Sequence, residues 1–149
     1  MKLKIPDNKK ELLSISKEIE SINGSLYLVG GTVIDILSKR DIKDWDIEVH
    51  GVDQKTLQSL LSNYGKTISC GKSYSVIKQK INGTEYDFTI SKANSIKEAA
   101  SRRDLTINSL MYHVQSETLI DNFDGLRDIE TGTLRHTSDS FADDPLRVL

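Results

Sequence analysis

The sequence has little of several features that mark secreted or membrane proteins. Its single cysteine is Cys70, so no internal disulfide can form. The first twenty residues contain no continuous apolar stretch of the kind that forms a signal peptide or a membrane span. These absences predict a soluble, cytoplasmic protein with no membrane partner.

Neither sign of charge is in excess, because 20 lysines and arginines stand against 22 aspartates and glutamates, for a formal net charge of -2 at pH 7. Composition therefore neither supports nor refutes binding to RNA. The chain shows no internal repeat, low-complexity segment or linker. With 149 residues, of which 37% are hydrophobic, it can bury one sizeable core, so a single domain is expected.

The N-terminal third alternates helical and strand patterns. A helix is predicted from the start signal Pro6-Asp7-Asn8 to Asn23-Gly24, because leucines and isoleucines recur at helical spacing between them. Residues 25–29 predict a short buried strand. The next residues, Gly30-Gly31-Thr32, indicate a tight turn into a second helix that runs through Leu37.

The middle of the chain predicts three more strands and a helix. Residues 44–49 alternate acidic and apolar side chains, which is typical of a strand, and a helix is expected over 53–64. Strand patterns follow over 73–81 and 85–90. They meet at Asn82-Gly83, a dipeptide that suits a two-residue hairpin turn because both residue types tolerate positive φ.

The C-terminal part is predicted to be mostly helical from Ser95 to Tyr112, with Arg102-Arg103-Asp104 inside the helix. Short strands, a turn at Gly125 and a final helix starting near Asp143 are expected beyond it.

The strongest local signal for chemistry is Asp44-Trp45-Asp46. A period of two along a strand sends both carboxylates to one face, while Trp45 and Ile47 enter the core. Two carboxylates so close repel each other unless a cation offsets their charge, and oxygen ligands of this kind suit Mg²⁺. Alone the pattern is weak, because most acidic pairs of this type are solvated surface residues.

Two neighbouring features strengthen that interpretation. Gly30-Gly31 lies where a strand meets a helix, so phosphate oxygens can approach backbone N–H groups there, although a plain tight turn is the commoner use of such a pair. Asp87 lies in an alternating strand and is a candidate third carboxylate. An ordinary exposed strand residue is an equally good interpretation of Asp87, because the sequence does not define the register between the strands.

Four runs of the sequence resemble one family. They are LVGGTVIDILSKRDIKDWDIEV, RRDLTINSLMYH, LIDNFDGLRDIETGTLRH and FADDPLRVL. In this order and spacing they resemble the class II tRNA nucleotidyltransferase (CCA-adding enzyme) and bacterial poly(A) polymerase family, which belongs to the polymerase-β-like nucleotidyltransferases. The resemblance covers roughly residues 25–149. It implies an α+β fold, with a mixed β-sheet flanked by helices.

The resemblance also implies roles for particular residues. Asp44 and Asp46 correspond to the Mg²⁺ ligands. Asp87, which comes from the strand alternation and not from the resemblance, completes the expected set of catalytic carboxylates. The nucleotide-binding residues implied in the same way are Gly30, Gly31, Arg103, Asp104 and Arg147. From the residues alone, Arg102-Arg103 is less specific, since an arginine pair on a helix is usually a solvated face or an ion-pair partner.

The implied reaction is attack by an RNA 3′-hydroxyl on the α-phosphate of CTP or ATP, assisted by Mg²⁺. By resemblance the RNA is a tRNA 3′ end that receives CCA. Poly(A) addition is a close alternative, and a nucleotide-binding module without turnover is an alternative of another class.

Three departures from the family pattern stand out. Ile34 replaces a family arginine expected near the triphosphate, and Ala99-Ala100 replaces Asp-Leu. In addition, Leu149 lies inside the last motif, before the family's neck region. We therefore expect residues 1–149 to be a nucleotidyltransferase head domain that ends just before the neck, where CTP or ATP is selected.

Overall fold

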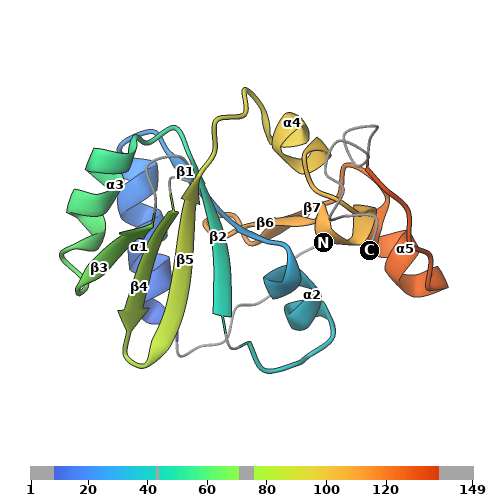
Figure 1. Ribbon diagram of the computed structural model, residues 1–149, viewed down its shortest axis with the longest axis horizontal. Helices are drawn as coiled ribbons and strands as arrows, with labels where there is room; N and C mark the ends of the chain where they lie inside the picture. The colour runs from blue at the N-terminus through green and yellow to red at the C-terminus, as the bar shows by residue number, and fades with distance from the viewer. Residues whose placement is uncertain (1–8, 43, 71–75, 138–149) are drawn as a thin grey trace.

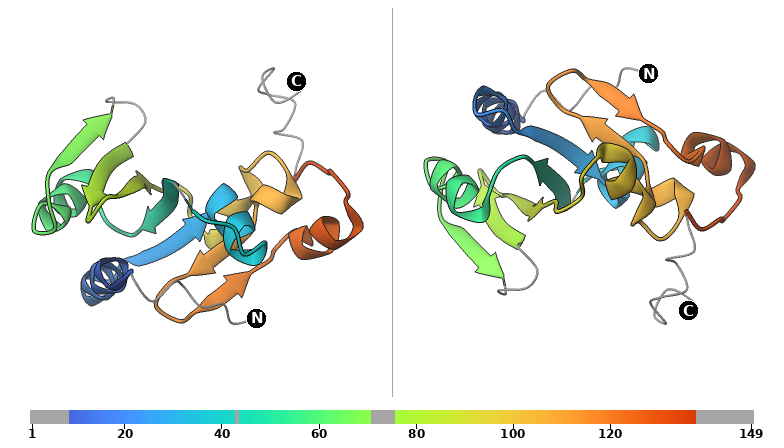
Figure 2. Two further views of the ribbon diagram at one scale, coloured as in Figure 1. Left: turned by 90° about the horizontal axis from the view of Figure 1, so that it is seen from below. Right: turned by 90° about the horizontal axis from the view of Figure 1, so that it is seen from above.

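The computed structural model of the chain describes residues 9–42, 44–70 and 76–137. They form a mixed sheet of seven strands in the order β3-β4-β5-β2-β1-β6-β7, with helices around it (Figure 1). Among the described strands β2 and β5 are the one parallel pair, and the other neighbours are antiparallel. The α+β fold class predicted from the sequence is confirmed. The helices α3 and α5 lie at opposite ends of the molecule in both views of Figure 2.

The N-terminal elements follow the predicted order. They are α1 (Lys10–Ser21), β1 (Ser25–Val29) and α2 (Gly31–Leu37). The predicted helix-start signal at residues 6–8 lies outside the described residues. The chain turns after α1 at Gly24, where a Cβ atom would lie 2.5 Å from Val52 Cγ2, so only glycine fits without a shift of its neighbours.

The central elements are β2 (Asp44–His50), α3 (Gln54–Leu61), β3 (Thr67–Cys70), β4 (Val76–Ile81) and β5 (Thr84–Ile90). The side chain of Asp53 caps α3 by accepting a hydrogen bond of 2.7 Å from Thr56 N. Asn82 and Gly83 have φ values of 50° and 81°, so the hairpin turn predicted between β4 and β5 is confirmed. The short strand β3 was not predicted.

The prediction of a mostly helical segment from Ser95 to Tyr112 is wrong. The structure has α4 (Ile96–Ser101), a 3₁₀ turn η1 (Thr106–Asn108) and β6 (Met111–His113). Asp104 Oδ1 accepts hydrogen bonds of 2.7 Å from Leu105 N and 2.9 Å from Asn108 Nδ2. Such local side-chain bonds compete with helix formation. The run then enters the sheet, where Met111 and Tyr112 pair with β1.

Two elements complete the chain, β7 (Thr118–Ile120) and α5 (Gly125–Thr131). The structure has a helix where only a turn at Gly125 was predicted. The helix expected near Asp143 lies outside the described residues. No helix in the described ranges is long and apolar enough to cross a bilayer.

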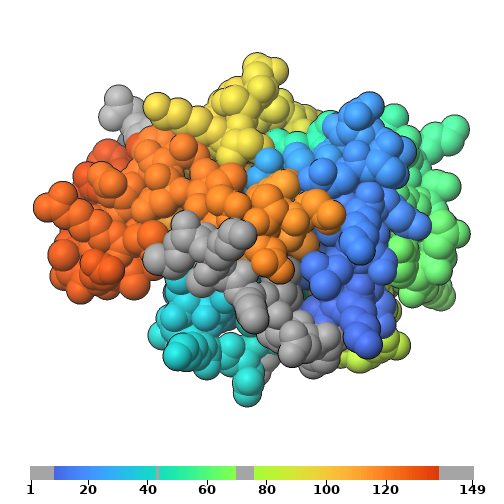
Figure 3. All heavy atoms as spheres, turned by 180° about the vertical axis from the view of Figure 1, so that it is seen from behind, coloured from blue at the N-terminus to red at the C-terminus, as the bar shows by residue number. Residues whose placement is uncertain are grey.

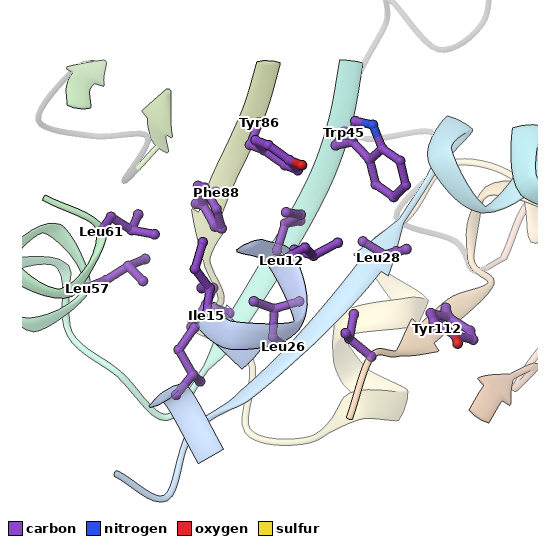
Figure 4. Close-up of a cluster of buried hydrophobic side chains, with 14 of the residues drawn as sticks. Leu12, Ile15, Leu26, Leu28, Trp45, Leu57, Leu61, Tyr86, Phe88 and Tyr112 are labelled. Atoms are coloured by element: carbon purple, nitrogen blue, oxygen red, sulfur yellow. The ribbon is translucent and has the colours of Figure 1, made fainter. Parts of the chain in front are cut away.

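One face of the sheet packs on α1 and α3. Figure 4 shows side chains from both helices gathered against β1, β2 and β5, including Leu12, Leu57, Leu28, Trp45 and Phe88. All five are no more than 1% exposed. This burial holds the central strands in place, so the opposite face of β2 and β5 has a defined geometry.

The opposite face carries a smaller apolar cluster under α4. It comprises Tyr27, Val29, Ala99, Ala100 and Met111. Ala99 and Ala100, which replace the Asp-Leu of the family pattern, are 5% and 0% exposed. Their small side chains bring α4 close to the sheet.

A polar contact also joins distant parts of the chain. Ser16 Oγ on α1 donates to Gln115 Oε1 beyond β6 at 3.1 Å. Seen from behind in Figure 3, α1 and the β6–β7 hairpin lie side by side.

Candidate active site

Asp44 and Asp46 lie on one face of β2. The intervening Trp45 and the following Ile47 point to the other face, and each is 1% exposed in the core. Asp44 is exposed and Asp46 is half-buried. Because the apolar residues are buried, the strand presents both carboxylates at the opposite surface.

Asp87 is brought to the same face by strand pairing. In the parallel pair of β2 and β5, Asp46 lies opposite Asp87 and Asp44 lies opposite Glu85. Neighbouring strands are about 4.8 Å apart, so the side chains of Asp46 and Asp87 are close neighbours. Lys78 Nζ on β4 lies 3.6 Å from Asp87 Oδ1. The structure therefore groups the three predicted carboxylates, while their catalytic roles stay predictions.

The carboxylate of Asp46 is electrostatically strained. Burial raises its pKa above the usual value, and the charges of Asp87 and Asp44 raise it further. Arg103 and Lys78 act in the opposite sense, but the net pKa shift is upward. A cation at this position would relieve the repulsion among the three aspartates.

The glycine turn lies beside this cluster. Gly30 has a φ of 61°, and a Cβ atom there would lie 3.9 Å from Asp46 Oδ2. Gly31 begins α2, whose first N–H groups have no partner within the helix. The two predicted phosphate-binding glycines are therefore adjacent to the predicted metal ligands. Ile34, at the position of the family arginine, lies on the same helix and is partly exposed.

Thr32 joins the glycine turn to the acidic strand. Its hydroxyl accepts a hydrogen bond of 2.8 Å from Asp46 N and lies 3.4 Å from Asp44 O. The residue is 2% exposed. The sequence did not reveal this role, because the contact depends on how α2 meets β2.

Arg103 lies at the edge of the acidic cluster. Its Nη2 donates to Glu48 Oε2 at 2.5 Å, and Glu48 Oε1 lies 2.7 Å from His50 Nε2. Burial alone would raise the pKa of Glu48, but the hydrogen bond from His50 and the charge of Arg103 hold it below the usual value. Glu48 and His50 were not predicted as site residues. They hold the Arg103 side chain near Asp46.

Asp104 and Arg147 are the remaining predicted nucleotide-binding residues. Asp104 accepts hydrogen bonds from Leu105 and Asn108 and so organises the turn after α4. Arg147 lies outside the described residues.

The described residues contain no group of three or more His, Cys, Asp or Glu side chains that could hold a metal ion by themselves. Mg²⁺ does not require such a group, because it usually keeps several waters and binds one or two carboxylates together with substrate phosphates. Asp44 and Asp46 fit that pattern, since burial and the charges of Asp87 and Asp44 raise the pKa of Asp46 and a bound cation would offset this.

The sheet and its acidic face have the architecture of a nucleotidyltransferase head. A family model described as the Poly A polymerase head domain matches residues 26–135. The chain belongs to this family.

Similar proteins include a CCA-adding enzyme of Buchnera aphidicola, which is 37% identical over 137 residues. A Multifunctional CCA protein of Xylella fastidiosa is 35% identical over 134 residues. Each alignment covers 83% of this chain and 32% of the relative. The chain thus spans about a third of the length of these curated relatives.

Solved structures show the same fold. The Thermotoga maritima CCA-adding enzyme in complex with tRNA has a TM-score of 0.83 and 27% identity, over 97% of this chain and 36% of its own. A CCA-adding enzyme in complex with CTP has a TM-score of 0.84 at the same identity and coverage.

Proposed function

We propose that this chain is the catalytic head of a Mg²⁺-dependent tRNA nucleotidyltransferase. The substrates are CTP, ATP and a tRNA whose 3′ end lacks CCA, so the expected compartment is the cytoplasm. The observation that carries the proposal is the register that sets Asp46 opposite Asp87, with the Gly30 turn beside them. The names of the relatives favour CCA addition. Poly(A) addition is the alternative, because the family description names that activity.

Asp44 and Asp46 are the residues that would hold Mg²⁺. When bound, Mg²⁺ lowers the pKa of an attacking hydroxyl and offsets the charge of a leaving pyrophosphate. Transfer of this kind depends mainly on positioning and on stabilisation of charge, so the protein has to align the two substrates.

The chain's own side chains divide this work. Gly30 and Gly31 admit the triphosphate to the start of α2, because no Cβ atom occupies that space. Arg103, oriented by Glu48, offsets negative charge near Asp46, and by resemblance Asp104 and Arg147 contact the same nucleotide. Asp87, opposite Asp46 in the sheet, is our candidate to accept the proton of the 3′-hydroxyl.

The direct test incubates the protein with Mg²⁺, labelled CTP or ATP and a tRNA without its CCA end, and follows extension on a gel. The wild-type chain should extend the tRNA. Asp44→Asn and Asp46→Asn should abolish extension and leave the circular dichroism spectrum unchanged. Asp41→Asn is the matched control, because Asp41 is exposed and precedes the strand.

If Asp44→Asn or Asp46→Asn still extended the tRNA, the assignment of that residue as a metal ligand would be wrong. A wild-type chain that binds Mg²⁺ and CTP but never extends RNA would instead identify a nucleotide-binding module without turnover.

A further inference from the structure

The acidic face of the sheet continues into a basic one. Successive strand pairings align Asp46 of β2, Asp87 of β5, Lys78 of β4 and Ile68 of β3 in one row across the sheet. A second row contains Asp44, Glu85 and Lys80. Paired residues in adjacent strands share a face. Both rows therefore run from carboxylates on β2 and β5 to lysines on β4.

A groove of about 580 Å³ follows these rows. Its lining includes Asp44 and Asp87 at one end and Lys66, Lys78, Lys80 and Ile68 at the other. We name the three lysines with Ile68 the lysine face. All four residues are exposed, and Ile68 is 61% exposed although it is apolar. The surface is therefore accessible, positively charged and continuous with the candidate active site.

The order of the strands decides which substrate this surface fits. The glycine turn follows β1, which lies on one side of β2, whereas β5, β4 and β3 lie on the other side. In phosphoryl transfer the attacking and leaving oxygens are roughly in line, on opposite sides of the phosphorus. A triphosphate whose leaving group lies at the glycine turn is therefore attacked from the side of β5, where Asp87 and the lysine face are.

We propose that the lysine face binds the phosphate backbone of the RNA strand whose 3′-hydroxyl is extended. This assignment rests on the proposed function, because that function defines which substrate attacks. Strands about 4.8 Å apart put β4 and β3 about 10 to 14 Å from β2. At a rise of about 3.4 Å per stacked nucleotide, this distance corresponds to roughly three or four nucleotides. The lysines thus contact phosphates just upstream of the reacting end, and Ile68 contacts a sugar or base.

The test compares two double variants in RNA binding without turnover. One is Lys66→Gln with Lys80→Gln, and the matched control is Lys17→Gln with Lys55→Gln, two exposed lysines on α1 and α3. Fluorescence anisotropy with labelled tRNA lacking CCA, over a range of salt concentrations, gives the affinity and its salt dependence. Calorimetry with CTP and Mg²⁺ gives the nucleotide affinity.

The lysine-face variant should bind tRNA at least tenfold more weakly than wild type at low salt. The slope of log K against log salt should decrease by about 0.7 for each RNA phosphate that the variant no longer neutralises. The affinity for CTP should stay within twofold of wild type, and the control variant should match wild type in every measurement.

Three results would overturn the assignment: no measurable RNA binding by the wild type, equal RNA affinity in the two double variants, or a CTP affinity that falls as much as that for RNA. Failure of the proposed function is distinguishable. RNA binding that depends on the lysines, without extension, would support the lysine face as an RNA-binding surface and contradict the transferase function. Extension by a lysine-face variant whose RNA affinity is unchanged would support the transferase function and contradict the role of the lysine face.

Discussion

Asp46 bears an unfavourable charge in the folded protein, since burial and the charges of Asp87 and Asp44 raise its pKa. A carboxyl group with a raised folded-state pKa binds more protons when folded than when unfolded, so the free energy of unfolding falls as pH rises through its titration. We therefore predict that, without divalent cations, Asp46→Asn is more stable than wild type at pH 7.

Thermal melts in EDTA between pH 3 and 8 measure this difference. It should vanish below about pH 4, the ordinary pKa region of aspartate. Equal melting temperatures at pH 7 would show that the acidic cluster is not strained, and Asp41→Asn controls for the loss of a surface charge.

Thr32 links the glycine turn to the acidic strand through the hydrogen bond from Asp46 N. Thr32→Val keeps the volume but removes the acceptor of the Asp46 N–H bond, and an unsatisfied buried N–H group costs about 1 to 3 kcal/mol. Loss of support behind metal ligands typically costs roughly 10- to 100-fold in metal affinity or activity. We expect weaker Mg²⁺ binding by calorimetry, with recovery in Thr32→Ser. Equal Mg²⁺ affinity in the valine and serine variants would contradict this role.

Gly31 offers a test of the phosphate-binding turn that spares the fold. A Cβ atom at Gly31 would have no neighbour within 4 Å, so Gly31→Ala should change the free energy of unfolding by less than about 0.5 kcal/mol. The added methyl group would occupy the space through which phosphates approach the backbone, so CTP affinity should fall markedly in calorimetry. Unchanged affinity would place the triphosphate elsewhere.

The predictability of the site differs from residue to residue. Alternation within one strand was enough to set Asp44 and Asp46 on one face. The position of Asp87 required the register between β2 and β5, which local patterns do not encode. Thr32 and Glu48 were missed because their partners, Asp46 N and Arg103, are set by tertiary packing.

The helix α5 packs closely on η1 at Gly125. A Cβ atom at Gly125 would lie 2.4 Å from Thr106 O, a backbone atom that cannot move cheaply. Overpacking of this kind typically costs about 1 to 3 kcal/mol. Gly125→Ala should therefore unfold at a clearly lower urea concentration.

Gly132→Ala is the comparison for that prediction. A Cβ atom there would have no neighbour within 4 Å, but the φ of 66° still disfavours alanine, at a cost of about 1 to 2 kcal/mol. A Gly125→Ala variant as stable as wild type would show that the close approach of α5 to η1 carries no energetic weight.

Elements with one dominant local pattern were predictable. Elements in which tertiary contacts override the local pattern were not. Strand alternation and the Asn82-Gly83 turn identified β5 and the hairpin. The segment 95–112 has helical spacing, yet hydrogen bonds to Asp104 and pairing of Met111 with β1 divide it. Helical periodicity alone could not anticipate either contact.

For the whole molecule, a bound cation should raise the free energy of unfolding. A ligand present at 100 times its Kd and bound only by the folded state adds about 2.7 kcal/mol. Since 1 kcal/mol shifts the melting temperature of a chain of this size by about 2 to 4 °C, saturating Mg²⁺ with CTP should raise it by roughly 5 to 10 °C. The double variant Asp44→Asn with Asp46→Asn should lose this increment, and an equal rise in both proteins would assign the effect to another site.

The pairing of β1 with β6 also has a consequence for synthesis on the ribosome. Val29 pairs with Met111, which follows it by 82 residues. At about 5 to 20 residues per second, Met111 is made roughly 4 to 16 s after Val29. The three aspartates are all translated before β6, so in that interval a nascent chain can assemble its acidic face while one edge of β1 is still open. An open strand edge is a template for wrong pairing, and protection of β1 is therefore most needed while residues 90–111 are being translated.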